Sequence, residues 1–571
     1  MSPSMDFSCR KIFLALFNTI SVLLLLISFP IILSKSSSSV FLSGIKNVEE
    51  ESCGGLDGFD DYATKCSYLQ THDTCVSQGY IDYIKLFYCI GNESFFLGFV
   101  ILLSWLLALF YLLGNTASEY FCSTLEGLSE ALGLSPTVAG VTLLSLGNGA
   151  PDFFSSIVSF TGSPEVAMGG GSVGISSILG GAFFVSTAVV GVINIATPIY
   201  RPGSAVVTVD KSCFIRDICF LFLALAALSA ILISGRIHLW EAILYVSIYI
   251  IYVVNVSTSF CCQRRDEQLR LPLILSTETS SLSSTQRQQP SSMGGEEEVE
   301  IRSELLNYWF SYFLSILHIL NLPFYLPRRM TIPLVSEEKW SKFYAVTSVT
   351  LSPLLLSALY SHHVPMEEEE KKTLEAYLIG GLIAAVLCIA TLITTESTKP
   401  PVRFLLPWLA SGFLMSVTWS YILAGELVSV VVSIGHILGI NASILGLTVL
   451  AWGNSVGDLM TNVAMAMNGG EDGVQVAISG CYAGPLFNAV VGLGASFVLS
   501  AWNVYPSAFV LPSDDVSNFE IIGFLVSGIL LAGVGFLRRR MKLGRAMGIG
   551  LICIYLCFLL FKSFILLDFQ I

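Results

Sequence analysis

Long apolar runs alternate with short polar stretches along this chain. A helix needs roughly 20 predominantly apolar residues to cross the hydrocarbon core of a membrane. Twelve runs near that length follow one another, at residues 95–114, 136–160, 169–195, 213–234, 239–256, 343–360, 374–394, 404–423, 444–467, 474–501, 521–536 and 547–567. The pattern predicts an all-α polytopic membrane protein.

A further apolar run, residues 12–33, lies near the amino terminus. It follows Arg10 and Lys11 and gives way to a serine-rich stretch. We therefore predict that residues 1–34 form a signal peptide or a signal anchor, and the run is long for a cleaved signal, so both interpretations stay open. In either case, residues 35–94 are expected outside the cytosol.

This extracytoplasmic segment has features that suit its predicted location. It carries an even set of cysteines, which favours disulfides in an oxidising compartment, with unpaired thiols as the alternative. The set is Cys53, Cys66, Cys75 and Cys89. Asn92 begins an Asn-Glu-Ser glycosylation acceptor. We expect a glycoprotein, but the sequence does not specify which cysteines pair.

Basic residues orient the helices, because Lys and Arg concentrate in cytosolic loops. Counting from an extracytoplasmic segment 35–94 places residues 259–342 and the basic residues of 538–545 in the cytosol. Within that loop, residues 276–300 are rich in Ser, Thr, Gln and Glu, which predicts a disordered regulatory linker.

Two local features of the middle of the chain are less distinctive. Residues 305–326 are apolar but contain asparagines and a proline and are followed by Arg328 and Arg329, which favours an interfacial helix over a span. His362 and His363 precede four glutamates and could bind a metal, but no ligand spacing is enforced there, so a solvated charged turn is the favoured interpretation.

Composition and charge agree with a membrane protein. The chain is 54% hydrophobic and 12% charged with a mean hydropathy of +0.73, against roughly 25% charged residues in ordinary soluble domains. The net charge of −13 arises mostly from acidic stretches in the loops, and no basic patch interleaved with aromatic residues is visible. A nucleic-acid partner is therefore not expected.

One polar motif occurs twice inside the apolar runs. Residues 147–152 read Gly-Asn-Gly-Ala-Pro-Asp and residues 453–458 read Gly-Asn-Ser-Val-Gly-Asp, at a constant offset of 306 residues. Each copy places an asparagine and an aspartate four residues apart, on one face of a helix. Ionisable groups are costly within a membrane and mark functional sites there.

The predicted topology makes the two motif helices antiparallel. Residues 95–258 and 404–567 then form two five-helix repeats of opposite orientation, with residues 343–395 as two additional helices. In transporters built from such inverted repeats, substrate and coupling-ion sites lie near the midplane at the repeat interface. We therefore predict an inverted five-plus-five arrangement with a site between its halves.

The chemistry of the motif indicates a cation site. Hard cations require several oxygen ligands, which Asn148, Asp152, Asn454 and Asp458 provide. Pro151 is expected to kink its helix and to free backbone carbonyls. Further candidate oxygens are those of Thr142, Ser145, Ser155, Ser156, Thr448, Ser455 and Thr461. The alternative is that both aspartates form structural hydrogen bonds only.

The helix after each motif is rich in small residues, which allow close backbone approach. The first carries Ser176 and Ser177 and the second carries Asn488. Packing alone could explain the glycines, but these polar residues are further candidate ligands.

Three stretches, residues 147–152, 449–458 and 484–488, resemble the two alpha repeats of the calcium/cation antiporter superfamily. The resemblance is closest to the branch containing the plant cation/calcium exchangers and the mitochondrial sodium/lithium/calcium exchanger. It implies a ten-helix, sodium/calcium exchanger-like core and secondary active antiport of calcium or another cation against sodium, potassium or protons. Asn148, Asp152, Asn454, Ser455, Asp458 and Asn488 would be the ion ligands.

This chain departs from the wider superfamily in its motifs. The motif acids are Asp where plasma-membrane sodium/calcium exchangers typically have Glu, and Gly457 replaces the proline of the second repeat. Ser177 and Pro485 stand where an Asn or Asp often occurs. A site with fewer acidic ligands could also favour sodium, potassium or protons as substrates.

Two other functions are compatible with buried aspartates. An intramembrane aspartyl protease would pair them as an acid and a base, but the Tyr-Asp and Pro-Ala-Leu elements expected of such a protease are absent. A passive cation channel would need no counter-ion. We favour a transporter over an enzyme, with inorganic cations as substrates and no resident cofactor. The sequence leaves the oligomeric state open, and the membrane could be vacuolar, another endomembrane or the plasma membrane.

Overall fold

The computed structural model describes most of the helical core and leaves out several connecting segments. The described residues are 62–71, 79–90, 95–124, 127, 145–161, 164–200, 209–274, 323–335, 340–362, 369–397, 400–401, 405–440, 442–468, 473–511 and 516–568. The predictions for residues 12–33, Cys53, Cys75, Asn92 and the 276–300 linker fall outside them, as does most of the charged turn after α13.

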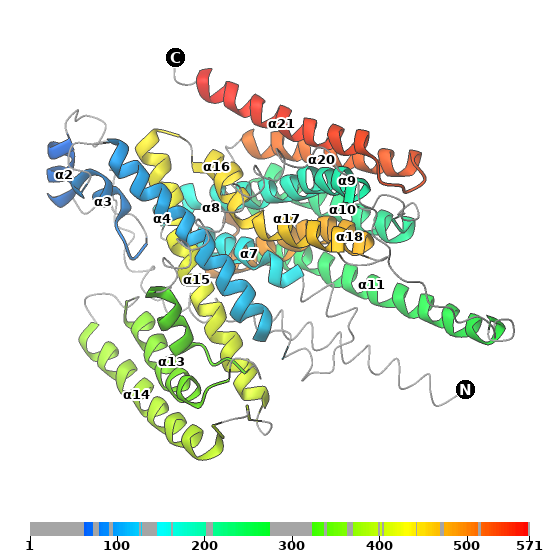
Figure 1. The fold of residues 1–571 in the computed structure, drawn as a ribbon. Helices are drawn as coiled ribbons and strands as arrows, with labels where there is room; N and C mark the ends of the chain where they lie inside the picture. The colour runs from blue at the N-terminus through cyan, green and yellow to red at the C-terminus, as the bar shows by residue number, and fades with distance from the viewer. Residues whose placement is uncertain are drawn as a thin grey trace, which may run out of the picture.

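The described elements are almost all helices (Figure 1). In the first half they are α2 (Tyr62–Thr71), α3 (Tyr83–Ile90), α4 (Phe95–Thr116), η2 (Ala117–Cys122), α7 (Ser145–Thr161), α8 (Pro164–Phe183), η4 (Phe184–Val189), α9 (Val190–Tyr200), α10 (Lys211–Ser234), β1 (Arg236–Ile237) and α11 (Leu239–Ile274). In the second half they are α13 (Lys342–His362), α14 (Glu369–Thr394), α15 (Leu405–Leu438), α16 (Ala442–Leu445), η5 (Gly446–Leu450), α17 (Ala451–Asn468), α18 (Gly473–Phe487), η6 (Asn488–Leu493), α19 (Gly494–Asn503), β2 (Phe509–Val510), α20 (Val516–Arg538) and α21 (Arg545–Asp568).

Ten helices of the described chain are long and apolar enough to cross a membrane. They correspond to ten of the twelve predicted runs. The other two runs contain α7 and the continuous helix α16–η5–α17, which carry the polar motifs. All twelve predicted runs therefore contain helix.

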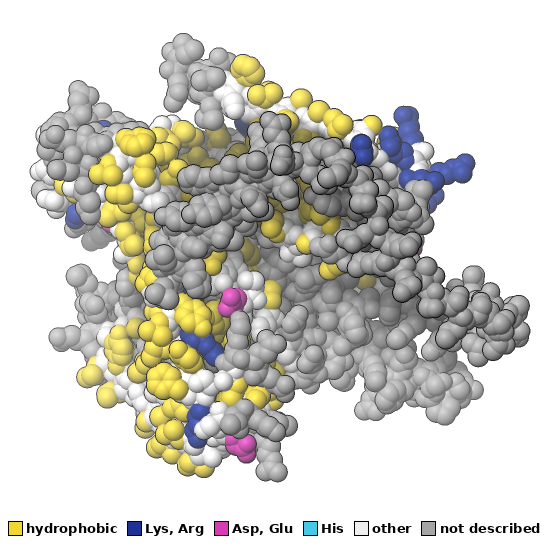
Figure 2. All heavy atoms as spheres, in the orientation of Figure 1, with side chains coloured by type: hydrophobic (Ala, Val, Ile, Leu, Met, Phe, Trp, Pro, Cys, Tyr) yellow, Lys and Arg dark blue, Asp and Glu magenta, His cyan; other side chains and the backbone are white. Residues whose placement is uncertain are grey.

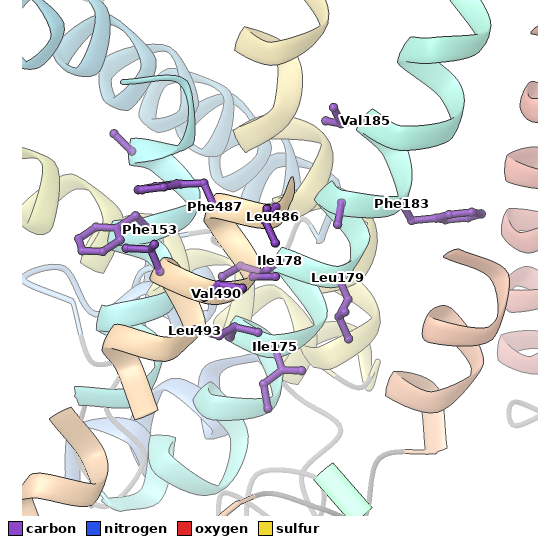
Figure 3. Close-up of a cluster of buried hydrophobic side chains, with 14 of the residues drawn as sticks. Phe153, Ile175, Ile178, Leu179, Phe183, Val185, Leu486, Phe487, Val490 and Leu493 are labelled. Atoms are coloured by element: carbon purple, nitrogen blue, oxygen red, sulfur yellow. The ribbon is translucent and has the colours of Figure 1, made fainter. Parts of the chain in front are cut away.

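The two repeats enclose a core in which the helices after the motifs lie deepest. The most apolar stretch of α18–η6–α19 is entirely buried within the protein, and that of α8–η4–α9 is 78% buried, against 17% for α14. Figure 3 shows their buried side chains, with Ile178 of α8 beside Leu486 and Val490. The small residues of α8 and α18 make this close packing of helices possible.

Helices α13 and α14 form an antiparallel pair near one end of α15 (Figure 1). Much of the surface of α14 is apolar and exposed, and Figure 2 shows hydrophobic side chains spread over this part of the molecule. That surface is what a lipid-facing helix presents. The two helices lie in the chain between the predicted repeats, residues 95–258 and 404–567.

Turns that were predicted on the same side of the membrane meet in the structure. On the predicted extracytoplasmic side, the turn after α10 pairs with the turn after α19 through β1 and β2, with Ile237 opposite Phe509. On the predicted cytosolic side, Val209 N–H donates to the carbonyl of Met541 at 2.9 Å. Met541 lies within an exposed basic turn between α20 and α21, visible at one end of the molecule in Figure 2. Which side faces the cytosol stays a prediction.

The segment predicted to be extracytoplasmic packs onto the first helix of each repeat. Tyr80 N–H and the Tyr83 hydroxyl donate to the carboxylate of Glu426 in α15. Gly79 N–H donates to Ser429 Oγ at 3.0 Å, and Trp105 Nε1 of α4 donates to the Tyr83 hydroxyl at 3.0 Å. Within this segment Cys66 and Cys89 form a disulfide, which confirms part of the predicted oxidised set.

Helix α11 includes the predicted span 239–256 and continues as a helix to Ile274, into the predicted loop. Most of the interfacial helix predicted at residues 305–326 falls outside the described residues. Arg328 and Arg329 are described: both are buried within the helical stretch 323–331, and Arg328 Nη1 donates to Thr116 Oγ1 at 2.7 Å. A buried guanidinium is tolerated because side-chain and carbonyl oxygens of α4 accept its hydrogen bonds.

A second buried polar cluster joins α10, α11 and α18. Asp217 is fully buried and forms an ion pair with Arg216 at 2.9 Å. Its carboxylate also accepts hydrogen bonds from the Tyr252 hydroxyl at 3.0 Å and from Ser479 Oγ at 2.9 Å. These bonds use both carboxylate oxygens, so Asp217 is a structural acid rather than an open ligand.

Candidate cation site

The two motifs meet at the centre of the helical core. Asp152 lies in α7, directly after Pro151, and Asn454, Ser455 and Asp458 lie in α17. All four have at most 3% of their surface exposed. α7 packs against both α17 and α18, so residues about 300 positions apart share one buried region.

The carboxylate of Asp152 is held by two amides from the second repeat. Asn454 Nδ2 donates to Asp152 Oδ1 at 3.0 Å and also reaches Ser155 Oγ at 3.4 Å. Asn488 Nδ2, at the start of η6, donates to Asp152 Oδ2 at 2.7 Å. The predicted ligands Asp152, Asn454 and Asn488 therefore form one hydrogen-bonded group that spans the two repeats.

Three oxygens around this group are buried and have no hydrogen-bond partner among the described residues. They are Asn454 Oδ1, Asn488 Oδ1 and Ser455 Oγ. Leaving a buried polar atom unpaired costs about 1–3 kcal/mol. Because each amide gives its N–H group to Asp152, its oxygen faces elsewhere and stays available. Unpaired oxygens around a carboxylate are what a hard cation would coordinate.

The second carboxylate, Asp458, shares this buried region. Asp458 has no hydrogen bond or ion pair with any described residue, and its charge acts on Asp152. Asp458 lies beside α18: a methyl group placed on Gly484 of that helix would be 3.9 Å from Asp458 Oδ1. No Lys, Arg or His among the described residues forms an ion pair with either acid. Two buried carboxylates of this kind need a bound cation or a proton to offset their desolvation.

Other predicted ligands are engaged elsewhere or lie outside the description. Ser176 Oγ donates to Asn518 Oδ1 of α20 at 2.9 Å, and Thr448 Oγ1 donates to the carbonyl of Ile444 in its own helix at 2.8 Å. Ser177 Oγ is buried without a described partner. Asn148 lies in α7 but its side chain is not described, and Thr142 is outside the described residues.

Glycines of α7 and α8 border the site: Gly149 belongs to the motif that the sequence revealed, whereas Gly181 was not singled out by the sequence. A methyl group on Gly149 would collide with Asn488 Oδ1, so glycine at this position leaves room for the Asn488 amide. A methyl group on Gly181 would lie within 3.8 Å of both oxygens of Asp152. Gly181 stands among many other glycines in its small-residue stretch, so only the fold distinguishes it.

The family of the chain follows from its repeated half. The family model described as sodium/calcium exchanger protein matches residues 102–258 and 408–564, which together make up more than half of the chain. The two matched segments are offset by 306 residues at both ends, the same offset as the motifs. The chain belongs to this family.

Named members of the sodium/calcium exchanger family align with nearly the whole chain. Cation/calcium exchanger 1 of Arabidopsis thaliana is 47% identical over 92% of this chain and 91% of its own length. Cation/calcium exchanger 2 of the same plant is 44% identical over 95% and 96%. The mitochondrial sodium/calcium exchanger protein of Rattus norvegicus is 30% identical over 87% and 86%. A solved structure titled H+/Ca2+ exchanger CAX is 12% identical, with a TM-score of 0.41, over 82% of this chain and 87% of that one.

Family membership and the helices together confirm several predictions. The chain is a multi-pass, all-α membrane protein with a duplicated exchanger unit. It resembles the plant cation/calcium exchangers more than the mitochondrial exchangers, which are similar over the same region at lower identity.

Proposed function

We propose that this protein is a secondary active cation antiporter. It exchanges calcium, or another cation, against sodium, potassium or protons by alternating access. The observation that carries the proposal is the Asp152 carboxylate, which amides of the other repeat hold beside unpaired buried oxygens. The exchangers named above are relatives over most of the chain and support the same activity.

The geometry accounts for coupling between the transported ions. Competing cations share one oxygen set, so occupancy by one excludes another. Only an occupied site neutralises Asp152 and Asp458 enough for the repeats to move past each other around it. By the relation between the two motifs, Asn148 is expected to hold Asp458 as Asn454 holds Asp152. Exchange, rather than leak, follows from the requirement for occupancy.

The alternative functions fit this arrangement less well. In a protease dyad the two aspartates share a proton, whereas both oxygens of Asp152 accept bonds from asparagine amides. A passive channel needs no neutralisation step. For location, we propose an endomembrane such as the vacuolar membrane, or the plasma membrane.

The test is calcium-45 uptake into proteoliposomes that contain the purified full-length protein. We expect uptake that requires sodium, potassium or a proton gradient on the opposite side, and that falls to background in Asp152→Asn and Asp458→Asn. Ser176→Ala is the matched control, because its hydroxyl is bonded to Asn518 rather than to the site. Uptake without any counter-ion would indicate a channel, and full activity in both aspartate variants would disprove the ligand assignment.

A further inference from the structure

Helix α8 approaches the candidate site at Gly181, a residue without a side chain. A methyl group built on Gly181 would lie 2.9 Å from Ser455 Oγ, 3.4 Å from Asp152 Oδ2 and 3.8 Å from Asp152 Oδ1. These are its three nearest neighbours outside its own helix, and all are oxygens of predicted ligands. The open side of Gly181 therefore faces the oxygen set that would hold a cation.

The adjacent glycine has a different role, which shows that packing alone does not explain Gly181. A methyl group on Gly180 would press into the carbonyl of Leu447 and lie 2.8 Å from the Cβ of Ala451. Gly180 thus permits the close approach of α8 to η5 and α17. Gly181 instead leaves a space bordered by Asp152 and Ser455.

An independent observation indicates that this space takes a ligand. Ser455 is fully buried, and its hydroxyl has no hydrogen-bond partner among the described residues. That hydroxyl is the atom nearest to the space beside Gly181. A cation bound to Asp152 at this point would satisfy the Ser455 oxygen.

The arrangement beside Gly181 is not repeated at the related positions of the second repeat. The offset of 306 residues relates Gly181 to Phe487, a fully buried aromatic residue. In the same way it relates Ser455 to Gly149, which has no hydroxyl to offer. A glycine also borders Asp458, but it is Gly484, where a methyl group would lie 3.9 Å from Asp458 Oδ1 and meet nothing else within 4 Å. The two carboxylates therefore have different surroundings.

We propose that Gly181 determines the size of the cation that Asp152 and Ser455 accept, and that its missing side chain admits a large monovalent cation such as potassium. This inference rests on the proposed cation site. Calcium binds oxygens at about 2.3–2.6 Å, sodium is of similar size, and potassium needs longer contacts and more room. A methyl group at position 181 would occupy that room and disfavour the larger ions most.

The test is competition for calcium-45 bound to the purified full-length protein in detergent. Lithium, sodium, potassium and rubidium chlorides are titrated against wild type, Gly181→Ala, and Gly533→Ala as the matched control, since a methyl group on Gly533 would meet nothing within 4 Å. In Gly181→Ala we expect the half-inhibitory concentrations of potassium and rubidium to rise about tenfold relative to those of lithium and sodium.

The outcomes separate this inference from the proposed function. Wild type that binds no calcium would overturn the cation site itself. Wild type that sodium displaces but potassium does not would overturn the inference alone, and this measurement needs no variant. A Gly181→Ala protein in which all four ions change by one common factor, or do not change, would also overturn it.

Discussion

Replacing Glu426 with alanine is expected to release the segment around residues 79–83 from the bundle. The Glu426 carboxylate is buried and accepts bonds from Tyr80 N–H and from the Tyr83 hydroxyl. Burial, followed by the hydrogen bond to Glu426, raises the pKa of Tyr83 above its ordinary range, so this phenol stays protonated and donates. A methyl group on Gly79 would lie 2.7 Å from both carboxylate oxygens, which shows how closely the loop surrounds Glu426.

The size of the effect follows from the bonds that are lost. The Tyr83 hydroxyl is buried, and leaving it without its acceptor costs about 1–3 kcal/mol, whereas the N–H of the exposed Tyr80 can bond water instead. Since about 1.4 kcal/mol corresponds to a factor of ten, local opening should become at least about 5 times more frequent. Glu426→Gln keeps one acceptor oxygen and should fall between wild type and alanine.

Hydrogen exchange of the full-length protein in detergent measures this opening. We expect the amides of Gly79 and Tyr80 to exchange faster by that factor in Glu426→Ala, with α18 unchanged. Ser429→Ala is the control with a smaller effect, because it removes only the acceptor of Gly79 N–H. Equal protection of Tyr80 in wild type and Glu426→Ala would refute the reasoning, since the carboxylate would then not be holding the loop.

Three further predictions concern the core. Gly149→Ala should displace the Asn488 amide and weaken calcium-45 binding about tenfold or more; unchanged binding would contradict the role of Gly149. Ser176→Ala should lower the free energy of unfolding by about 1 kcal/mol through its lost bond to α20 while cation competition stays the same, and altered competition would return Ser176 to the site. Asp217→Ala should cost about 3–5 kcal/mol in thermal unfolding because it leaves Arg216 unpaired, with Asp217→Asn intermediate; equal stability would show that the pair contributes nothing net.

Most of the architecture was predictable from the order of residues. The twelve runs could be located because bilayer thickness sets the length of a span, and that constraint acts on each segment separately. The motifs and their offset were equally easy to recognise in the sequence, since a repeated polar pair inside an apolar segment is rare and its burial in a membrane is costly. Asp152, Asn454 and Asn488 were predicted as ligands on residue type and spacing, and they meet in the structure.

Other features depend on which surfaces face each other. No partner for Arg328 could be read from the sequence, whereas in the structure oxygens of α4 accept its hydrogen bonds and make its burial possible. The sequence permitted several disulfide pairings, and the path of the chain brings Cys66 to Cys89. Ser176 has the chemistry of a ligand, yet it meets Asn518 instead of Asp152.

The sequence by itself therefore determined that this is a membrane protein, the number of predicted spans, the repeated motif and the main candidate ligands. Each of these depends on residues close together in the chain. Tertiary structure decided which amide holds which carboxylate, which oxygens remain unpaired and why Gly181 differs from Gly180. The physical reason is that a side chain's partners are set by packing across helices hundreds of residues apart. Spacing along one helix defines which face a residue occupies, but only the packed bundle defines what lies opposite that face.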